Sequence, residues 1–285
     1  MLITPIDLTF VAIGLVVMAV GFLRRRVPPP LPPEAPPPAS RLELFLTGLA
    51  LVPAAVGPNV LVVALTPGMP EMPLLAKWVL LPSIVLLGLV WAIAARLGLA
   101  RLNNRIWTGI WVGFGCTAAL DVFRLTSFSL GLLPGNMPRM FGVLILDQMA
   151  LGPSTLSDIV GNLYHSWVSV CFGLTYTLLV GRTRWWGGLI WGLIIEVGMM
   201  ITPPMVVAMD TGYFGLKLGK GLLNGVFLGS LVPHISFGIA LGLLLERYTR
   251  HKGSVLRLLR DAFRQESRSE LLSGEGLGLG RRGDR

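Results

Sequence analysis

Seven apolar stretches, each close to the length of a membrane span, constrain this chain more than any other feature. They cover residues 4–23, 42–66, 76–95, 106–128, 160–181, 186–208 and 220–246. A helix needs about 20 mostly apolar residues to cross the hydrocarbon core of a bilayer. Only 14% of the residues are charged, and the mean hydropathy is +0.70. The sequence therefore predicts an all-α, polytopic bundle of about seven spans and excludes an ordinary cytosolic enzyme or a disordered chain.

The positions of the basic residues predict the orientation. Lys and Arg collect on the cytoplasmic side of bacterial membrane proteins. With the N-terminus outside and the C-terminus inside, 19 of the 24 basic residues lie in predicted inner segments. We therefore expect a multi-pass protein of the bacterial plasma (inner) membrane. The net charge of +9 then reflects topology, and nucleic acid is not an expected partner.

Composition divides the chain into five parts. These are an N-terminal anchor helix (1–23), a proline-rich cytoplasmic linker (24–41), a two-helix module (42–104), a four-helix, repeat-like bundle (105–250) and a basic cytoplasmic tail (251–285). The prolines predict an extended linker, which acts as a spacer or docks an SH3-like partner. An apolar stretch at 140–149 is too short to span and predicts an interfacial or re-entrant helix.

The tail carries a basic amphipathic pattern over residues 253–272, in which Arg257, Arg260, Arg264 and Arg268 alternate with apolar side chains. Helices of this kind lie on anionic lipid. The expected partners are therefore the lipid bilayer, anionic lipid at the tail, and other membrane proteins.

A repeat is visible in the second half of the chain. Residues 172–182 align with residues 237–247 at a constant offset of 65, with Phe, Gly, Leu and Arg in common. A histidine precedes each copy, His165 in one and His234 in the other, although their offsets differ by four residues, about one helical turn. Repeats of this sort often place a site at their interface. We therefore expect two related helix pairs.

Several short motifs carry a resemblance to a family. They are Tyr164-His165, the run from Cys171 to Tyr176, the Trp-Trp-Gly-Gly at 185–188, the run from Met199 to Met205, and the run from His234 to Gly238. Over residues 105–250 the chain resembles the YagU-like bacterial inner-membrane proteins. The resemblance implies an integral membrane protein without established enzymatic activity, connected with stress or acid tolerance.

Four ionisable side chains fall deep within four predicted spans: Asp121, His165, Glu196 and His234. At about 1.5 Å per helical residue, Glu196 lies near the middle of the bilayer, and Asp121 and His165 lie nearer its outer surface. Charged groups at such depths are costly and often functional. If they face inward, they form a polar funnel, with Glu196 and His234 as its core and the other two at its outer entrance.

This residue set suits several chemistries. Imidazole and carboxylate groups bind first-row metal ions, and sulfur ligands favour Cu(I). Two imidazoles can hold a haem. A chain of glutamate and histidine can relay protons. Met199, Met200 and Cys171 are secondary ligand candidates, and the cofactor is left open between a metal ion, a haem and none. Structural roles are the alternatives: Asp121 pairs with Arg124 three residues on, the histidines bond their neighbours, and the methionines fill the core.

No enzyme motif accompanies these residues. The chain lacks a His-Glu-x-x-His helix, a Gly-x-Ser-x-Gly elbow, a Walker loop and a dinucleotide fingerprint. We therefore predict a non-enzymatic membrane protein with a buried Glu/His/Asp site for a cation, metal ion or proton, and a transport-like or sensing role. A scaffold or assembly subunit of a larger membrane complex is one alternative. A haem-binding electron carrier is another.

Overall fold

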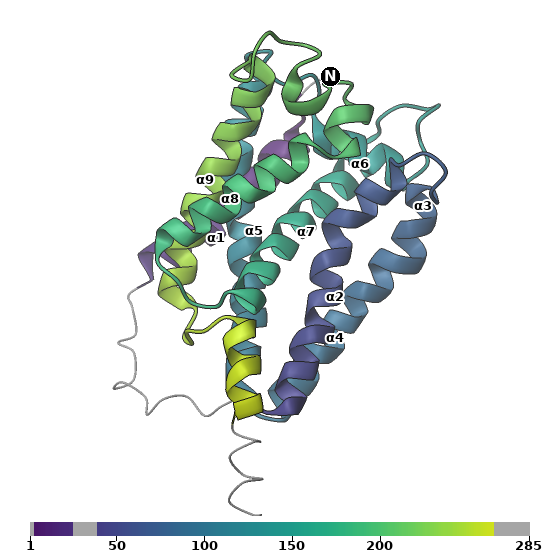
Figure 1. The fold of residues 1–285 in the computed structure, drawn as a ribbon. Coiled ribbons are helices and arrows are strands. Elements are labelled where there is room, and N and C mark those ends of the chain that lie inside the picture. The colour runs from purple at the N-terminus through teal and green to yellow at the C-terminus, as the bar shows by residue number, and fades with distance from the viewer. Residues whose placement is uncertain (1–2, 25–38, 265–285) are drawn as a thin grey trace, which may run out of the picture.

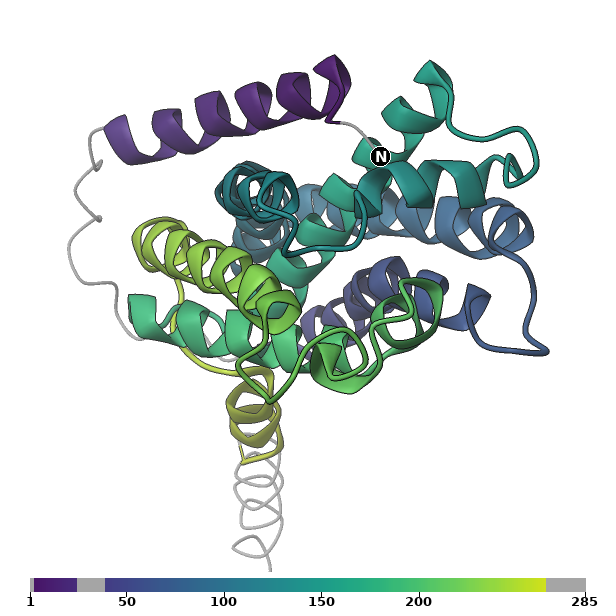
Figure 2. The ribbon, with the colours of Figure 1, turned by 90° about the horizontal axis from the view of Figure 1, so that it is seen from above.

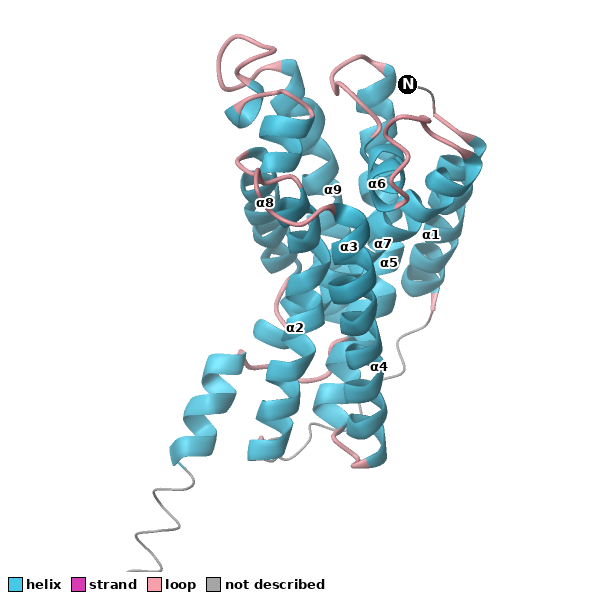
Figure 3. Cartoon of the chain, turned by 90° about the vertical axis from the view of Figure 1, so that its right-hand side faces the viewer, coloured by secondary structure: helices cyan, strands magenta, loops and turns pink. Residues whose placement is uncertain are grey.

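The structure is a computed structural model that describes residues 3–24 and 39–264. Within these ranges the chain forms helices and loops without a strand (Figures 1 and 3), which confirms the predicted all-α fold. The long helices are α1 (Pro5–Leu23), α2 (Arg41–Ala64), α4 (Leu81–Arg96), α5 (Ala100–Ser129), α7 (Thr155–Leu179), α8 (Trp185–Met200) and α9 (Gly225–Tyr248). The short elements are α3 (Met72–Leu75) and the π-helix η1 (Ala76–Leu80), which run on into α4, and α6 (Met137–Ile145), η2 (Pro204–Ala208) and η3 (Tyr213–Gly215).

In the described part of the chain, five helices are long and apolar enough to cross a membrane: α1, α2, the continuous helix Met72–Arg96, α5 and α9. The other two predicted spans correspond to α7, which carries many Ser, Thr and Asn side chains, and α8, which is apolar but only 16 residues long. The polar side chains of α7 are mostly buried, because α5, α2 and α6 pack around it. The architecture fits an integral membrane protein, and the count of seven spans remains a prediction.

Hydrogen bonds gather the predicted cytoplasmic segments at one end of the bundle. Arg247, at the end of α9, donates to the carbonyl oxygen of Phe22 at the end of α1, at 2.7 Å. Arg105, near the start of α5, donates to the carbonyl oxygen of Gly253 in the tail, at 2.5 Å. The helix ends that the predicted topology places on one side therefore do lie together. Which side of the membrane they face remains a prediction.

Polar caps set where several helices begin. Thr4 and Asp7 form a reciprocal capping box at the start of α1, and Ser154 and Ser157 form another at the start of α7. Asn224 caps α9 by accepting a hydrogen bond from a backbone amide in its first turn. The second box starts α7 five residues before the predicted span at 160.

Two helix pairs, α5 with α7 and α8 with α9, pack with their backbones in contact. A Cβ atom on Gly113 of α5 would lie 2.7 Å from the carbonyl oxygen of Ser169 in α7. A Cβ atom on Gly192 of α8 would lie 2.4 Å from the carbonyl oxygen of His234 in α9. Only glycine permits such an approach, as in other membrane helix pairs. Two close-packed helix pairs therefore flank the site described below, and α6 packs on α7 at least as closely, at Gly142 and Gly161.

The remaining helices surround these pairs. α2 and α4 pack against α7 and α5 through a shared apolar core that includes Ala50, Val90, Ile106 and Leu174. α6, which corresponds to the predicted interfacial stretch, lies against α7 near the end of the bundle that holds the N-terminus (Figure 1). α1 lies at the edge of the bundle and packs on α5 (Figure 2). The predicted division into five parts remains a prediction.

The tail begins with a helix over residues 255–264 that carries Arg257, Arg260 and Arg264. This helix leaves the bundle at the end that holds Arg105 and Arg247 (Figure 1). Arg268 of the predicted lipid-binding surface lies outside the described residues, as do residues 25–38 of the proline-rich linker. Lipid binding by the tail therefore remains a prediction.

Candidate functional site

The four predicted side chains form two carboxylate–histidine pairs. Nε2 of His165 in α7 lies 2.9 Å from Oδ1 of Asp121 in α5. Nδ1 of His234 in α9 lies 2.8 Å from Oε2 of Glu196 in α8. Each of the two close-packed helix pairs thus contributes one carboxylate and one histidine. The predicted residues converge as two pairs rather than as one cluster.

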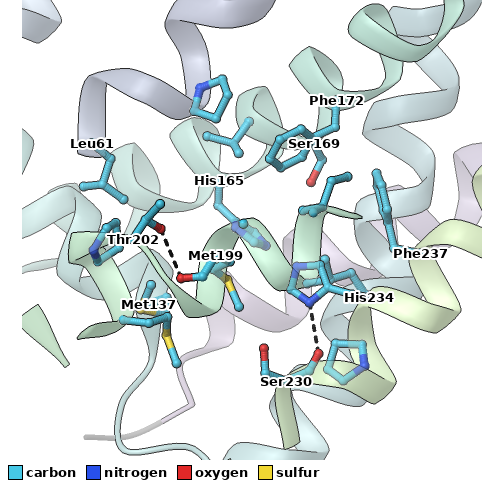
Figure 4. Close-up of a pocket in the computed structure, with 18 of the residues that line it drawn as sticks. Leu61, Met137, His165, Ser169, Phe172, Met199, Thr202, Ser230, His234 and Phe237 are labelled. Carbon is cyan, nitrogen blue, oxygen red and sulfur yellow. Dashed lines mark hydrogen bonds between the residues drawn. The ribbon is translucent and has the colours of Figure 1, made fainter. Parts of the chain in front are cut away.

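Both histidines line one cavity of about 360 Å³ between the two helix pairs, α2 and α6. Figure 4 shows His165 and His234 on its wall, together with Ser169, Phe172 and Phe237. The wall is mostly apolar, and neither Asp121 nor Glu196 belongs to it. The histidines therefore stand between the cavity and the two buried carboxylates. The volume lies in the lower part of the range of small-molecule pockets.

The repeat relates the two pairs. At the offset of 65 residues, His165 corresponds to Ser230, and Ser169 corresponds to His234. All four of these side chains line the cavity. Each helix thus presents one serine and one histidine four residues apart, and their order along the chain is reversed between α7 and α9. At an offset of 75, Gly113 of α5 corresponds to Gly188 of α8 and Asp121 corresponds to Glu196. The site is therefore built twice, once in each helix pair.

Hydrogen bonding fixes which ring nitrogen carries the proton in each neutral histidine. Nδ1 of His234 lies near two acceptors, Oε2 of Glu196 and the carbonyl oxygen of Ser230 at 2.9 Å, so it must donate. Nε2 of His165 donates to Oδ1 of Asp121, because a carboxylate that is ion-paired with Arg124 can only accept. The second nitrogen of each ring has no hydrogen-bond partner among the described residues. Each histidine can therefore take up a second proton without losing its carboxylate.

A fixed cation neutralises only the first pair. Nε of Arg124 donates to Oδ1 of Asp121 at 2.7 Å, which confirms the local pairing that the sequence offered as an alternative. Nη1 of Arg124 donates to Oδ1 of Asn136 at 2.8 Å, whereas Nη2 is buried without a partner. Arg124 is 6% exposed and also lines the cavity. Its charge balances that of Asp121 whatever the state of His165.

The second pair lacks such a cation. Glu196 is 0% exposed, and Oε2 accepts a hydrogen bond from Oγ of Ser230 at 2.8 Å. Its other oxygen, Oε1, has no partner. In the described structure, His234 is the one basic side chain paired with it. A fully buried carboxylate is costly unless it is paired, so its neutrality depends on a proton held by Glu196 or His234.

A buried polar chain extends the first pair to the N-terminal helix. Nδ2 of Asn136 and Nδ2 of Asn162 each donate to the carboxylate of Asp7, at 3.0 Å. Through Asn136 this carboxylate is joined to Arg124 and so to Asp121. Asp7 was not among the predicted site residues, because a carboxylate in the first turn of a helix is common as part of a capping box. Ser230 was also missed, although the repeat offset could have found it.

The secondary ligand candidates lie in different places. Met199 lines the cavity, whereas Met200 is fully buried in an apolar cluster with Met205. Sγ of Cys171 lies 3.6 Å from the carbonyl oxygen of Pro53 in α2, and Cys171 is not part of the cavity wall. Among the described residues, no three His, Cys, Asp or Glu side chains are grouped to hold a metal ion. The described residues therefore bring the predicted ligands together only as two carboxylate–histidine pairs.

The third histidine, His251, lies outside the spans, in the tail after α9. The backbone amide of Arg182 donates to the carbonyl oxygen of His251 at 3.1 Å. Partial burial, followed by the nearby guanidinium groups of Arg101 and Arg105, lowers the pKa of His251. His251 is therefore not part of the cavity wall or of either carboxylate–histidine pair.

Comparisons with known proteins give no match. No family model, curated protein or solved structure matches the chain. The resemblance to YagU-like proteins therefore remains an expectation from short motifs.

Proposed function

We propose that this chain is a non-enzymatic integral membrane protein that takes up and releases a proton at Glu196 and His234, next to a ligand cavity. The observation that carries the proposal is the fully buried Glu196 carboxylate, whose basic partner is a histidine and not an arginine or lysine. Burying a charge without a counter-charge is strongly unfavourable. The pair is neutral when it holds one proton, so the protein must bind one in its stable state.

The path of the proton is defined by the imidazole of His234. Its Nδ1 faces Glu196, and the residue lines the cavity. A proton that arrives from the cavity can bind Nε2, and the Nδ1 proton can then move to Glu196. Histidine is the side chain best suited to this exchange near neutral pH. The pair thus links the charge state of a buried carboxylate to the contents of the cavity, which supports a transport-like or sensing role.

The expected location follows from the distribution of charge. The inner segments hold most of the basic residues, which supports the bacterial plasma membrane with the N-terminus outside. The resemblance to YagU-like proteins implies acid tolerance, and a proton-binding pair is compatible with that role.

The chain has three histidines, which makes the test direct. Protein carrying isotope-labelled histidine in lipid nanodiscs gives three imidazole signals by NMR, assigned with the variants His165→Gln, His234→Gln and His251→Gln. We expect His234 to be an imidazolium at neutral pH and to become neutral in Glu196→Gln, because that variant removes the negative partner. The control is Glu71→Gln, which alters a carboxylate outside the cavity wall.

One combination of results would overturn the proposal. It is a His234 signal that stays neutral from about pH 5 to about pH 9, together with an infrared spectrum in which Glu196→Gln removes no carboxylic-acid band. The pair would then hold no proton in any form.

A further inference from the structure

We infer that the cavity binds a singly charged carboxylate with a hydrocarbon body, and that one proton enters with it, at His165. This inference rests on the proposed function, because it assumes that Glu196 and His234 share a proton. It adds the class of ligand and the group that responds to it.

The cavity wall calls for an apolar body. It includes Val62 of α2, Phe141 of α6, Phe172 of α7 and Phe237 of α9, and polar atoms form a small part of it. Apolar surface in such a pocket favours a hydrocarbon ligand, because the surfaces of the ligand and of the pocket leave water together. A volume of about 360 Å³ suits a small molecule and not a whole phospholipid.

One side of the cavity offers hydrogen bonds to an anion. Nη2 of Arg124 has no acceptor in the structure, although Arg124 is buried and lines the cavity. Nδ1 of His165 has no partner either. The two side chains lie close together, because Nε of Arg124 and Nε2 of His165 bond the same oxygen, Oδ1 of Asp121. Arginine is the side chain best suited to bind a carboxylate in an apolar setting.

A count of charges limits the ligand to one negative charge. Arg124 balances Asp121, and the shared proton balances the Glu196–His234 pair. Protonated His165 then leaves one positive charge on the cavity wall, which one carboxylate neutralises. A doubly charged phosphate would leave an excess negative charge in an apolar site, which is costly. The cavity therefore favours a monoanion over a dianion.

The charged and titratable groups around His165 agree with this count. They are Asp121 and Arg124 on α5, Tyr164 beside it on α7, and the Glu196–His234 pair across the cavity. The hydroxyl of Tyr164 donates to the carbonyl oxygen of Gly57 in α2 and stays neutral. Arg139 of α6 is already paired with Asp158 of α7, at 3.1 Å. His165 is therefore the group free to change charge when an anion enters.

The test uses full-length protein in nanodiscs and radiolabelled octanoate in equilibrium dialysis, with empty nanodiscs subtracted. We expect saturable binding of one octanoate per chain, and competition by unlabelled octanoate. Octanol and octyltrimethylammonium, which have the same chain with a neutral or a cationic head, should not compete. Acetate, which has the same head group but almost no hydrocarbon, should compete only weakly, and competition as strong as that of octanoate would contradict the role of the apolar wall.

Two variants assign the binding groups. Arg124→Gln should weaken octanoate binding at least about tenfold, and Arg124→Lys should weaken it less, because lysine keeps the charge but not the planar fork. The control is Arg139→Gln, which changes an arginine outside the cavity wall. In the native protein, octanoate affinity should fall as the pH rises, because one proton must enter with the anion, and in His165→Gln it should not depend on pH.

Three outcomes would each overturn the inference: no saturable octanoate binding at any pH, equal competition by octanol and octyltrimethylammonium, or unchanged affinity in a folded Arg124→Lys variant. These readouts are independent of the NMR signal of His234. A protein that shows the His234 imidazolium but binds no octanoate refutes the ligand and keeps the proton site. A protein that binds octanoate without that imidazolium, and without a carboxylic-acid band from Glu196, refutes the proton site.

Discussion

The two carboxylate–histidine pairs have nearly the same geometry but a different charge balance. In both pairs a ring nitrogen lies within 2.9 Å of a buried carboxylate oxygen, and in both the histidine lies on the cavity wall. Asp121 has Arg124 beside it, whereas Glu196 has the hydroxyl of Ser230. One arginine thus separates a carboxylate that has a permanent counter-charge from a carboxylate whose neutralisation depends on a proton.

The repeat explains how this difference arises within one chain. At the offset of 75 residues that matches Asp121 to Glu196, Arg124 corresponds to Met199. Met199 lines the same cavity as Arg124. The presence of Arg124 in one helix pair and Met199 in the other is therefore the sequence difference that accounts for the difference in charge balance.

The largest effect is expected from Arg124→Gln. It leaves the Asp121 carboxylate buried without its permanent cation, and breaking a buried ion pair in this way costs about 3–5 kcal/mol. Chemical denaturation in mixed micelles measures the loss. The double variant Asp121→Asn with Arg124→Gln should recover much of it. A loss no larger than that of Arg139→Gln, whose side chain is more exposed, would remove the contrast between the pairs.

A cation can be placed beside the second pair with Met199→Arg. The new guanidinium should neutralise Glu196 as Arg124 neutralises Asp121, so that His234 no longer needs a second proton. Histidine NMR should then show His234 neutral at a pH where the native protein has an imidazolium. Met199→Gln is the control for polarity without charge. An imidazolium that persists in a folded Met199→Arg variant would mean that position 199 is not equivalent to position 124.

Glu196→Gln should change stability much less than Arg124→Gln. The amide still accepts the hydrogen bond from Ser230, and the neutral pair needs no proton, so we expect a change of no more than about 1 kcal/mol. The same denaturation experiment measures it. A loss as large as that of Arg124→Gln would show that Glu196 has a permanent cationic partner after all.

The smallest expected effect is a change in the pH dependence of stability in His251→Gln. His251 lies outside the two pairs but also responds to pH, so its contribution must be separated from theirs. Its pKa is lowered in the folded protein, so the unfolded chain binds more protons just below about pH 6.5, the ordinary value. Stability should therefore fall as the pH falls through that range. His251→Gln should flatten this slope in thermal unfolding scans, without changing the signal of His234. An unchanged slope would assign the acid sensitivity to the cavity pairs.

The sequence predicts the helices well because membrane spans depend on length and apolar content, and these are local properties. The pairing of Asp121 with Arg124 is local too, since residues three apart lie on one helix face. The partner of each histidine is not local. It depends on the rotation of each helix about its axis, which hydropathy does not fix.

Neighbouring residues show how much this rotation matters. Met199 lines the cavity, while Met200, the next residue on α8, is fully buried in an apolar cluster and is not part of the cavity wall. Asp7 meets Asn136 and Asn162, which are more than 100 positions away along the chain. Such contacts follow from helix packing, and no sequence motif around Asp7 predicts them.

The glycine contacts within each helix pair have a mechanical consequence. The backbones of α5 and α7 touch at Gly113, and those of α8 and α9 touch at Gly192, so each pair forms a tightly joined block. Each block carries both its carboxylate and its histidine, while the cavity lies between the blocks. A rocking motion of one block against the other would therefore widen or close the cavity and leave both proton-binding pairs intact.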